Sequence, residues 1–421
     1  MPSRSSSSRA LWRDSDFRHL WAGQTASQFG AQSSQVVLPL VAVVALQAGA
    51  VQLGALRAVQ QLPILFFSLI VGVWVDRWRP RSVMVLADFG RAAVLAAIPV
   101  AVLLGMLGMP VLLVVGFLVG TLSVCFDVGY QASLVRVVAR DRLAQGNSAL
   151  EGSRSAAQVG GPALGGAMVS LVSAPYAVVA SGGFFLLSAL SIRRIRSGET
   201  APRRAEQHPR VGRQIAEGLQ LVFRNAALRS VAVASGIFQF SFAALMTVYL
   251  LFLPRTLHLS GATVGLVLAA MGPGALLGSL LSARLPGRFG YGTVMVASAF
   301  LADGVMLCVP ALHGSSAATV ALLMAVNFLF GVFSQLVDVT VTTVRQTLTP
   351  ARIQGRVVAT INFLGMGMTP LGSLLGGWVA GRWGLRTGLL LTAVALAASP
   401  LFMASSPLAR LGRRLPGAEV L

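Results

Sequence analysis

Residues 62–92 read LPILFFSLIVGVWVDRWRPRSVMVLADFGRA, two apolar stretches on either side of a short polar segment. That segment carries one glycine, one aspartate and three arginines, at Gly72, Asp76, Arg77, Arg79 and Arg81. Apolar runs recur along the whole 421-residue chain, and most exceed the ~18 residues that mark a membrane-spanning helix. Because lipid offers no partners for backbone polar groups, runs of this length form helices. The sequence therefore predicts an all-α membrane protein.

The composition agrees with a membrane protein and excludes an ordinary soluble domain. Hydrophobic residues make up 55% of the chain and charged residues 11%, against about 25% charged residues in soluble domains. All 33 basic residues are arginine, and the net charge is +20. In a soluble protein this charge would suggest a nucleic-acid partner, but here most arginines fall in the two tails and in every second loop. This asymmetry marks the cytoplasmic side, so we expect cytoplasmic termini, an even number of spans and no nucleic-acid partner.

Twelve segments fit transmembrane helices, and they divide into two groups of six. The expected helices cover residues 20–46, 52–75, 82–105, 109–133, 146–172, 174–192, 228–254, 261–284, 291–312, 316–344, 355–381 and 384–404. The long arginine-rich connection at 193–227 is expected to be a cytoplasmic linker between a first bundle, residues 20–192, and a second, residues 228–404. Residues 1–19 and 405–421 are the expected cytoplasmic tails.

The two halves share polar landmarks in the same order. DVGYQASLVR at 127–136 has a counterpart in DVTVTTVR at 338–345, and RLAQGN at 142–147 has one in RIQGR at 352–356. Pro162 corresponds to Pro370, again about 210 residues later. Chance similarity between apolar helices does not account for ordered polar matches. The pattern indicates an internal duplication, as in transporters built from two related halves with a binding site between them.

The polar segment after the second helix resembles a loop of the major facilitator superfamily, which reads G-x-x-x-D-R-x-x-R-R or similar between helices 2 and 3. The resemblance implies two pseudo-symmetric six-helix bundles and a latch that closes the cytoplasmic side. Asp127 lies 17 residues past Pro110, or about 25 Å along a helix, which places it near the cytoplasmic end. There it could pair with Arg77 or Arg81. The alternative is that the loop only carries the charges that set topology.

The fifth expected helix contains Gly161-Pro162-Ala163-Leu164-Gly165-Gly166, which resembles the G-P-x-x-G-G core of the antiporter motif in drug exporters. Small residues permit close helix packing, and proline bends a helix. The upstream glycines of the full motif are replaced by Ser148 and Ala157. Glycine-rich packing without a role in transport direction is the alternative.

From about residue 16 to 404 the chain resembles the macrolide-efflux and enterobactin-export branch of that superfamily. The resemblance rests on FRHLWAGQTASQFG, the segment 62–92, FDVGYQASLV and NSALEGSRSAAQVGGPALGG. It implies export driven by proton antiport. Helix 1 often carries an acid after its glycine in this branch, whereas Ala31 follows Gly30 here.

Acids inside the helices are candidates for the proton site, because an ionisable group is costly in a membrane and is usually functional. The candidate coupling acids are Asp127, Glu151, Asp303 and Asp338. Two acids also have an arginine three residues later on the same helical face, as Glu151–Arg154 and Asp88–Arg91. A static salt bridge is the alternative role for any of these acids.

Polar residues in the cavity-lining helices suggest a wide, mostly apolar chamber that suits an amphiphilic organic molecule. The candidate cavity residues are Gln24, Gln28, Gln32, Arg57, Gln61, Gln239, Asn327 and Gln335. Interhelical hydrogen bonding is the alternative for each of them.

Several functions are excluded or not expected. The four histidines are far apart, so we expect no metal site. Cys125 and Cys308 lie in apolar segments, so we expect no disulfide. A phosphate-binding loop for ATP needs a lysine, and the chain has none. We therefore expect no cofactor and no enzyme activity, but a monomeric multi-pass protein of the cell membrane, with a small-molecule substrate and protons as coupling ion. An importer or facilitator of the same fold and a non-transporting receptor are the alternatives.

Overall fold

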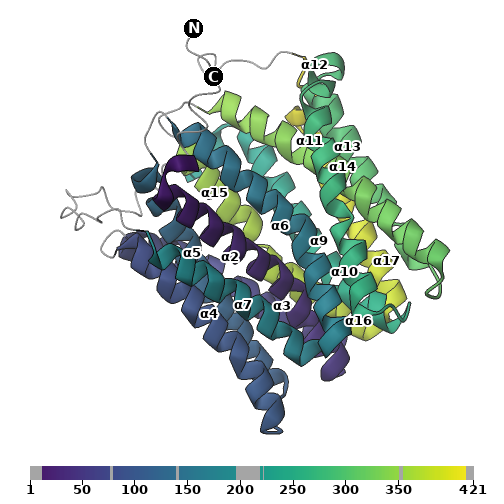
Figure 1. The fold of residues 1–421 in the computed structure, drawn as a ribbon. Coiled ribbons are helices and arrows are strands. Elements are labelled where there is room, and N and C mark those ends of the chain that lie inside the picture. Colours follow the sequence, from purple (N-terminus) through teal and green to yellow (C-terminus); the bar gives the residue numbers. More distant parts are fainter. Residues whose placement is uncertain are drawn as a thin grey trace. The chain divides into compact units, whose positions relative to one another are not determined.

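The computed structural model describes residues 12–75, 79–138, 142–195, 219–220, 222–349 and 354–413 (Figure 1). Within these ranges the chain is helical and contains no β-strand. The all-α expectation is confirmed for the part of the chain that the structure describes.

Each of the first six expected segments is helical. The elements are α2 (Ser15–Leu40), which continues into the π-helical turn η1 (Val41–Ala45), then α3 (Ala50–Val75), α4 (Pro80–Leu103), α5 (Met109–Val137), α6 (Leu143–Val172) and α7 (Ala174–Arg193). Asp14 caps α2 by accepting hydrogen bonds from the backbone amides of Asp16 and Phe17. Prolines occupy the first turns of α4, α5 and α7, where the missing amide hydrogen is no loss.

The second half is helical in the expected segments too, but several of these are interrupted. The elements are α9 (Ala226–Arg255), α10 (Gly261–Ala269), α11 (Met271–Ser282), α12 (Leu285–Phe289), α13 (Tyr291–Met306), η3 (Val309–Ala311), α14 (Ala317–Leu348), α15 (Gln354–Met366), α16 (Thr369–Trp383), α17 (Leu385–Leu396), α18 (Ala398–Ser405) and η5 (Pro407–Arg410). The expected helix 261–284 is divided at Ala270, and the helix 355–381 is divided just before Pro370. Proline has no backbone N–H to donate and its ring clashes with the preceding turn, so Pro370 accounts for the break ahead of it.

Ten helical segments in the described residues are long and apolar enough to cross a membrane. The expected fifth helix, α6, is 30 residues long but is not among the ten. Helix α6 is rich in glycine, alanine and serine and carries Glu151 and Arg154, which lowers its hydropathy. The count of twelve spans remains a prediction.

The chain forms two compact units. Unit 1 comprises residues 1–48, 59–206 and 260–269, and unit 2 comprises residues 49–58, 207–259 and 270–421. Each unit thus contains one short segment from the other half of the sequence. The segment in unit 1 is α10, and the segment in unit 2 is the first part of α3.

In unit 1, helix α2 packs against α6 and α7, α4 packs against α5 and α7, and α10 packs against α6. The core near one end of these helices gathers buried side chains from α2, α4, α5, α6 and α7. They include Phe17, Leu20, Met84, Phe126, Leu150 and Ile192.

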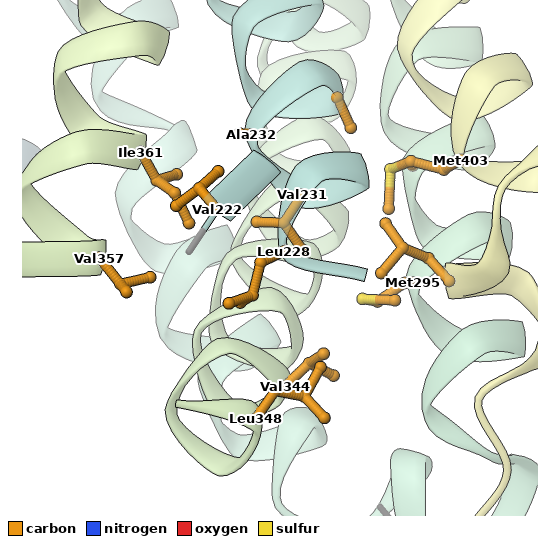
Figure 2. Close-up of a cluster of buried hydrophobic side chains, with 13 residues drawn as sticks. Val222, Leu228, Val231, Ala232, Met295, Val344, Leu348, Val357, Ile361 and Met403 are labelled. Carbon is orange, nitrogen blue, oxygen red and sulfur yellow. The ribbon is translucent and has the colours of Figure 1, made fainter. Parts of the chain in front are cut away.

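In unit 2, helix α9 packs against α15, α16, α17 and α18, while α14 packs against α11 and α13. Figure 2 shows one core cluster, in which side chains from α9, α13, α14, α15 and α18 come together. Its members include Leu228, Val231, Met295, Val344, Leu348, Val357, Ile361 and Met403.

Candidate functional site

The polar segment between α3 and α4 is described only in part. Gly72 lies in α3, whereas Asp76 and Arg77 lie outside the described residues. Arg79 has an extended backbone at the N-terminal cap of α4, which Pro80 then begins. The guanidinium of Arg81 donates a hydrogen bond to the backbone carbonyl of Arg193 at the end of α7. Arg81 therefore ties the first turn of α4 to the last residue of α7.

Asp127, the expected partner of this loop, is exposed on α5. The described cations that act on its charge are Arg91 of α4 and Arg154 of α6. The pairing of Asp127 with Arg77 or Arg81 remains a prediction.

A buried ion pair lies in the interior of unit 1. The guanidinium of Arg91 forms a salt bridge with the Asp88 carboxylate, and the two side chains are 2% and 0% exposed. The i,i+3 pairing expected from the sequence is confirmed, and the pair is among the most deeply buried polar groups of unit 1. Because an isolated charge in such a place is very costly, each residue depends on the other.

Residues of three other helices complete the surroundings of Arg91. One of its terminal nitrogens, Nη2, donates to the Ser27 hydroxyl of α2 at 3.0 Å, and Nη1 donates to the Ser123 hydroxyl of α5 at 3.3 Å. The guanidinium also lies over the rings of Phe126 and Phe185, 4.6 and 4.2 Å from their centroids. Cation–π contacts of this kind stabilise a desolvated arginine.

The glycines of the G-P-x-x-G-G segment are positions where α6 approaches other backbones. A Cβ atom at Gly161 would lie 2.4 Å from the Cβ of Gln32, and one at Gly165 would lie 2.9 Å from the carbonyl oxygen of Ser33. These two glycines therefore set the contact between α6 and α2.

Gly166 faces α10. A Cβ atom there would lie 2.2 Å from the carbonyl oxygen of Gly261 and 2.7 Å from the Cα of Gly265. Beyond this crossing, the hydroxyl of Ser170 accepts a hydrogen bond of 2.7 Å from the backbone amide of Ala262, an amide in the first turn of α10. The crossing thus brings two backbones into direct contact and satisfies a helix-end donor.

A second crossing in unit 2 is the counterpart of the first. A Cβ atom at Gly54 of α3 would lie 2.6 Å from the carbonyl oxygen of Ser373 and 3.0 Å from the Cα of Gly377 in α16. Gly54 precedes Gly261, and Gly166 precedes Gly377, by about the spacing that separates the matched landmarks of the two halves. The sequence analysis did not single out these partners, although small residues at i and i+4, as in Gly261 and Gly265, are a known signal of close helix contact.

The other candidate coupling acids lie in different surroundings. Glu151 and Arg154 are both more than half exposed, with 3.9 Å between their charged atoms. Asp303 on α13 is 2% exposed, and its Oδ2 atom has no hydrogen-bond partner among the described residues. Asp338 is exposed on α14, and its charge acts on Arg345. Their roles in coupling remain predictions.

The candidate cavity residues differ in burial. Gln24 is buried with its Oε1 atom unpaired among the described residues, and the Nε atom of Arg57 is likewise buried and unpaired. The other glutamines of the set are half-buried, namely Gln28, Gln32, Gln61, Gln239 and Gln335. Because the two units are described separately, a cavity lined by all of these residues remains a prediction.

Asn327 is fully buried in unit 2. Its amide nitrogen donates to the Tyr249 hydroxyl of α9 at 2.7 Å and to the backbone carbonyl of Leu323 at 2.8 Å. One turn away, the rings of Phe242 and Phe330 stack with centroids 5.5 Å apart. Asn327 thus links α14 to α9.

Replacing Tyr249 with phenylalanine is expected to lower the free energy of unfolding by about 0.6 kcal/mol, the average for an interhelical hydrogen bond in a membrane protein. The loss is small because Asn327 keeps its bond to Leu323. Denaturant titration of the purified protein in micelles measures it. An Asn327→Ala variant, which leaves the Tyr249 hydroxyl buried without this partner, should lose more, and an equal or smaller loss would contradict the assignment.

No group of three or more histidine, cysteine, aspartate or glutamate residues suited to a metal ion is found in the described part of the chain.

The family model for the transmembrane secretion effectors, a branch of the major facilitator superfamily, matches residues 6–414. The chain belongs to this family.

Two relatives of this transmembrane secretion effector are multidrug efflux pumps named Tap. The chain is 29% identical over 340 residues to the pump of Mycolicibacterium fortuitum, which covers 78% of this chain and 80% of the relative. It is 26% identical to the pump of Mycobacterium tuberculosis over 392 residues, and this alignment covers 88% of each chain. The expected resemblance to drug exporters of the major facilitator superfamily is confirmed.

Solved structures share the fold of this major facilitator protein. A bacterial homologue of the iron transporter ferroportin, in an inward-facing state, matches with a TM-score of 0.75 at 15% identity, over 93% of this chain and 98% of that one. The nucleoside transporter NupG matches with a TM-score of 0.71 at 14% identity, over 92% of this chain and 98% of that one. At this identity the likeness establishes the fold and not the substrate.

Membership of this family defines the class of the protein. It is a multi-pass transporter of the cell membrane and not an enzyme. The expectations for protein class and location are confirmed.

Proposed function

We propose that this transporter exports amphiphilic organic solutes, such as drugs, antibiotics, siderophores or secondary metabolites, by alternating access coupled to proton antiport. The observation that carries the export direction is the likeness to multidrug efflux pumps over 88% of both chains. The close packing of Gly161, Gly165 and Gly166 supports it, because it gives the antiporter-like segment a definite place between α2 and α10. The transporter works as a monomer.

The duplicated halves are the moving bodies of this proposal. Residues 20–192 and 228–404 form the two bundles, and the linker 193–227 and both tails face the cytoplasm. The distribution of arginine supports this orientation, because basic loops stay on the cytoplasmic side. Asp76, Arg77 and Asp127 belong to a latch on that side.

The substrate class follows from the polar residues on otherwise apolar helices. Half-buried amides such as Gln28, Gln32 and Gln239 can donate and accept hydrogen bonds without carrying charge. Scattered neutral groups on apolar walls suit molecules with a large apolar body and several polar substituents.

Expression in a host that lacks its own efflux pumps is expected to lower the accumulation of some fluorescent dyes and antibiotics. An uncoupler, which collapses the proton gradient, is expected to restore accumulation to the level of cells with an empty vector. Dye fluorescence in the cells and growth at graded antibiotic concentrations measure the two effects.

Three results would contradict the proposal in different ways. Unchanged accumulation of every compound would contradict export. Increased accumulation would indicate an importer or facilitator of the same fold. Efflux that persists with the uncoupler would contradict proton coupling while leaving export intact.

A further inference from the structure

Four helices of unit 1 converge on the buried pair of Asp88 and Arg91. Helix α4 supplies the pair, α2 supplies Ser27, α5 supplies Ser123 and Phe126, and α7 supplies Phe185 and Ser188. Every contact to the pair that the structure describes comes from a helix. The pair is therefore held at the centre of a helix bundle, where a change of charge would act on every packed helix.

The two oxygens of the Asp88 carboxylate have unequal surroundings. Oδ1 accepts from Arg91 and, at 3.4 Å, from the Ser27 hydroxyl. Oδ2 is buried without a hydrogen-bond partner in the described part of the chain. The Ser188 hydroxyl is also buried and lies near enough to the carboxylate to favour its anion, although the two groups do not meet the geometry of a full hydrogen bond.

The Ser188 hydroxyl can serve either charge state of Asp88, because it can donate to a carboxylate or accept from a carboxyl O–H. With a proton on Oδ2, the carboxyl group would gain an O–H donor, and the adjacent Ser188 hydroxyl can accept from it. Oδ1 would keep its bond from Ser27. Buried polar atoms are nearly always paired, so the arrangement fits a protonated carboxyl as well as it fits an ionised one.

A second acid shares the same arginine. Asp127 lies one residue after Phe126 on α5, and the charge of Arg91 acts on it. Asp127 is exposed, whereas Asp88 is 0% exposed. Arg91 thus contacts the buried Asp88 on its own helix and acts on the exposed Asp127 of α5 only through its charge.

We propose that Asp88 is the proton-binding carboxyl of this transporter and that proton uptake at Oδ2 breaks its ion pair with Arg91, whose charge is then left without the Asp88 anion. The inference rests on the proton-coupled export proposed above and names the coupling site. Proton uptake and release at Asp88 would then change the attraction between α4 and α5. The proton is the only species that is transferred.

The other acids are less suited to this role. Glu151 is more than half exposed in its pair with Arg154. Asp303 is buried, but no cation acts on it among the described residues, so it can remain neutral throughout the cycle. Asp88 combines complete burial with a contacting arginine, which lets it exist in both charge states.

The titratable groups around Asp88 are few. On α4 it meets Arg91, and α5 brings Asp127 and Cys125, both within reach of the Arg91 charge. The contacts from α2 and α7 are uncharged hydroxyls and rings; His19 on α2 lies eight residues, or about 12 Å, before Ser27. A titration that depends on Arg91, is lost in Asp88→Asn and persists in Asp127→Asn is therefore assignable to Asp88.

Infrared difference spectroscopy of the purified full-length protein in liposomes, acidic minus alkaline buffer, tests the proposal without a substrate. The wild type is expected to show the C=O band of a protonated carboxyl, and Asp88→Asn is expected to lose it. Ser188→Ala should shift the band frequency, because the O–H loses its acceptor. In Asp127→Asn the band should appear only at lower pH. The Asp127 anion is then gone, so the positive charge of Arg91 stabilises the Asp88 anion alone. Glu151→Gln, from the exposed i,i+3 pair, should leave the band unchanged.

A band that survives in Asp88→Asn, or its absence from the wild type, would overturn the proposal. If Asp88→Asn cannot be purified in a folded form, the spectra of Ser188→Ala and Asp127→Asn test the proposal. A carboxyl band that is unaltered in both variants would overturn the role of Asp88. Efflux assays separate the two proposals: uncoupler-insensitive efflux by the wild type contradicts proton coupling itself. Uncoupler-sensitive efflux that is unchanged in Asp88→Asn overturns the role of Asp88 alone.

Discussion

Replacing Arg91 with alanine is expected to lower the free energy of unfolding by about 3–5 kcal/mol, the cost of removing one partner from a buried ion pair. The substitution would leave the Asp88 carboxylate at 0% exposure without its cation, and it would also empty the space between Phe126 and Phe185. Denaturant titration in micelles measures the loss. The loss should be smaller in acidic buffer, because protonation of Asp88 removes the uncompensated charge.

The matched control for this variant is Arg154→Ala, since Arg154 also pairs with an acid three residues away. That pair is exposed, and exposed ion pairs contribute about 0.2–1 kcal/mol. A double variant, Asp88→Asn with Arg91→Gln, should recover part of the stability because it leaves no unpaired charge. Equal losses in Arg91→Ala and Arg154→Ala would show that burial of the pair has no energetic consequence.

Replacing Gly166 with alanine is expected to destabilise the protein by about 1–3 kcal/mol and to reduce efflux. The cost is that of overpacking a well-packed site. The added methyl would lie 2.2 Å from the carbonyl oxygen of Gly261 and 2.7 Å from the Cα of Gly265. Both are backbone atoms, so α6 and α10 have to move apart as helices. Thermal unfolding of the purified protein measures the first effect, and dye efflux measures the second.

Gly152→Ala is the control on the same helix. A Cβ atom at Gly152 meets no atom within 4 Å, so the substitution should stabilise α6 by up to about 1 kcal/mol through its helix propensity. The counterpart position Gly54 should behave like Gly166. If Gly166→Ala matched Gly152→Ala in stability and efflux, the close crossing of α6 and α10 would be wrong.

The helices could be predicted from the sequence because a spanning helix is defined by its own apolar length. Helix α4, expected at 82–105, begins at Pro80 and ends at Leu103. The breaks at Ala270 and before Pro370 were not predicted, because they depend on backbone geometry that hydropathy does not report. Hydropathy also does not report α6 as a span. This helix is rich in glycine and packs closely, but its small and polar residues give it a low hydropathy.

The candidate site could be predicted only where one helix contains all of it. The pair of Asp88 and Arg91 follows from i,i+3 spacing, but Ser27 and Phe185 reach it from helices far away in the sequence. The candidate cavity glutamines of helix 1 show the same limit. Gln24 is buried whereas Gln28 and Gln32 are half-buried, because the neighbours of α2 change along its length.

The two glycine crossings also bear on how the two halves of the sequence can change. Residues 260–269 come from the second half but pack in the unit built mainly from the first, and residues 49–58 do the reverse. A side chain gained at Gly54 would have to be accommodated by the backbone at Gly377, which belongs to the other half of the sequence. A substitution at either crossing is therefore limited by backbone atoms from the opposite half of the chain, so neither half can be altered there without regard to the other.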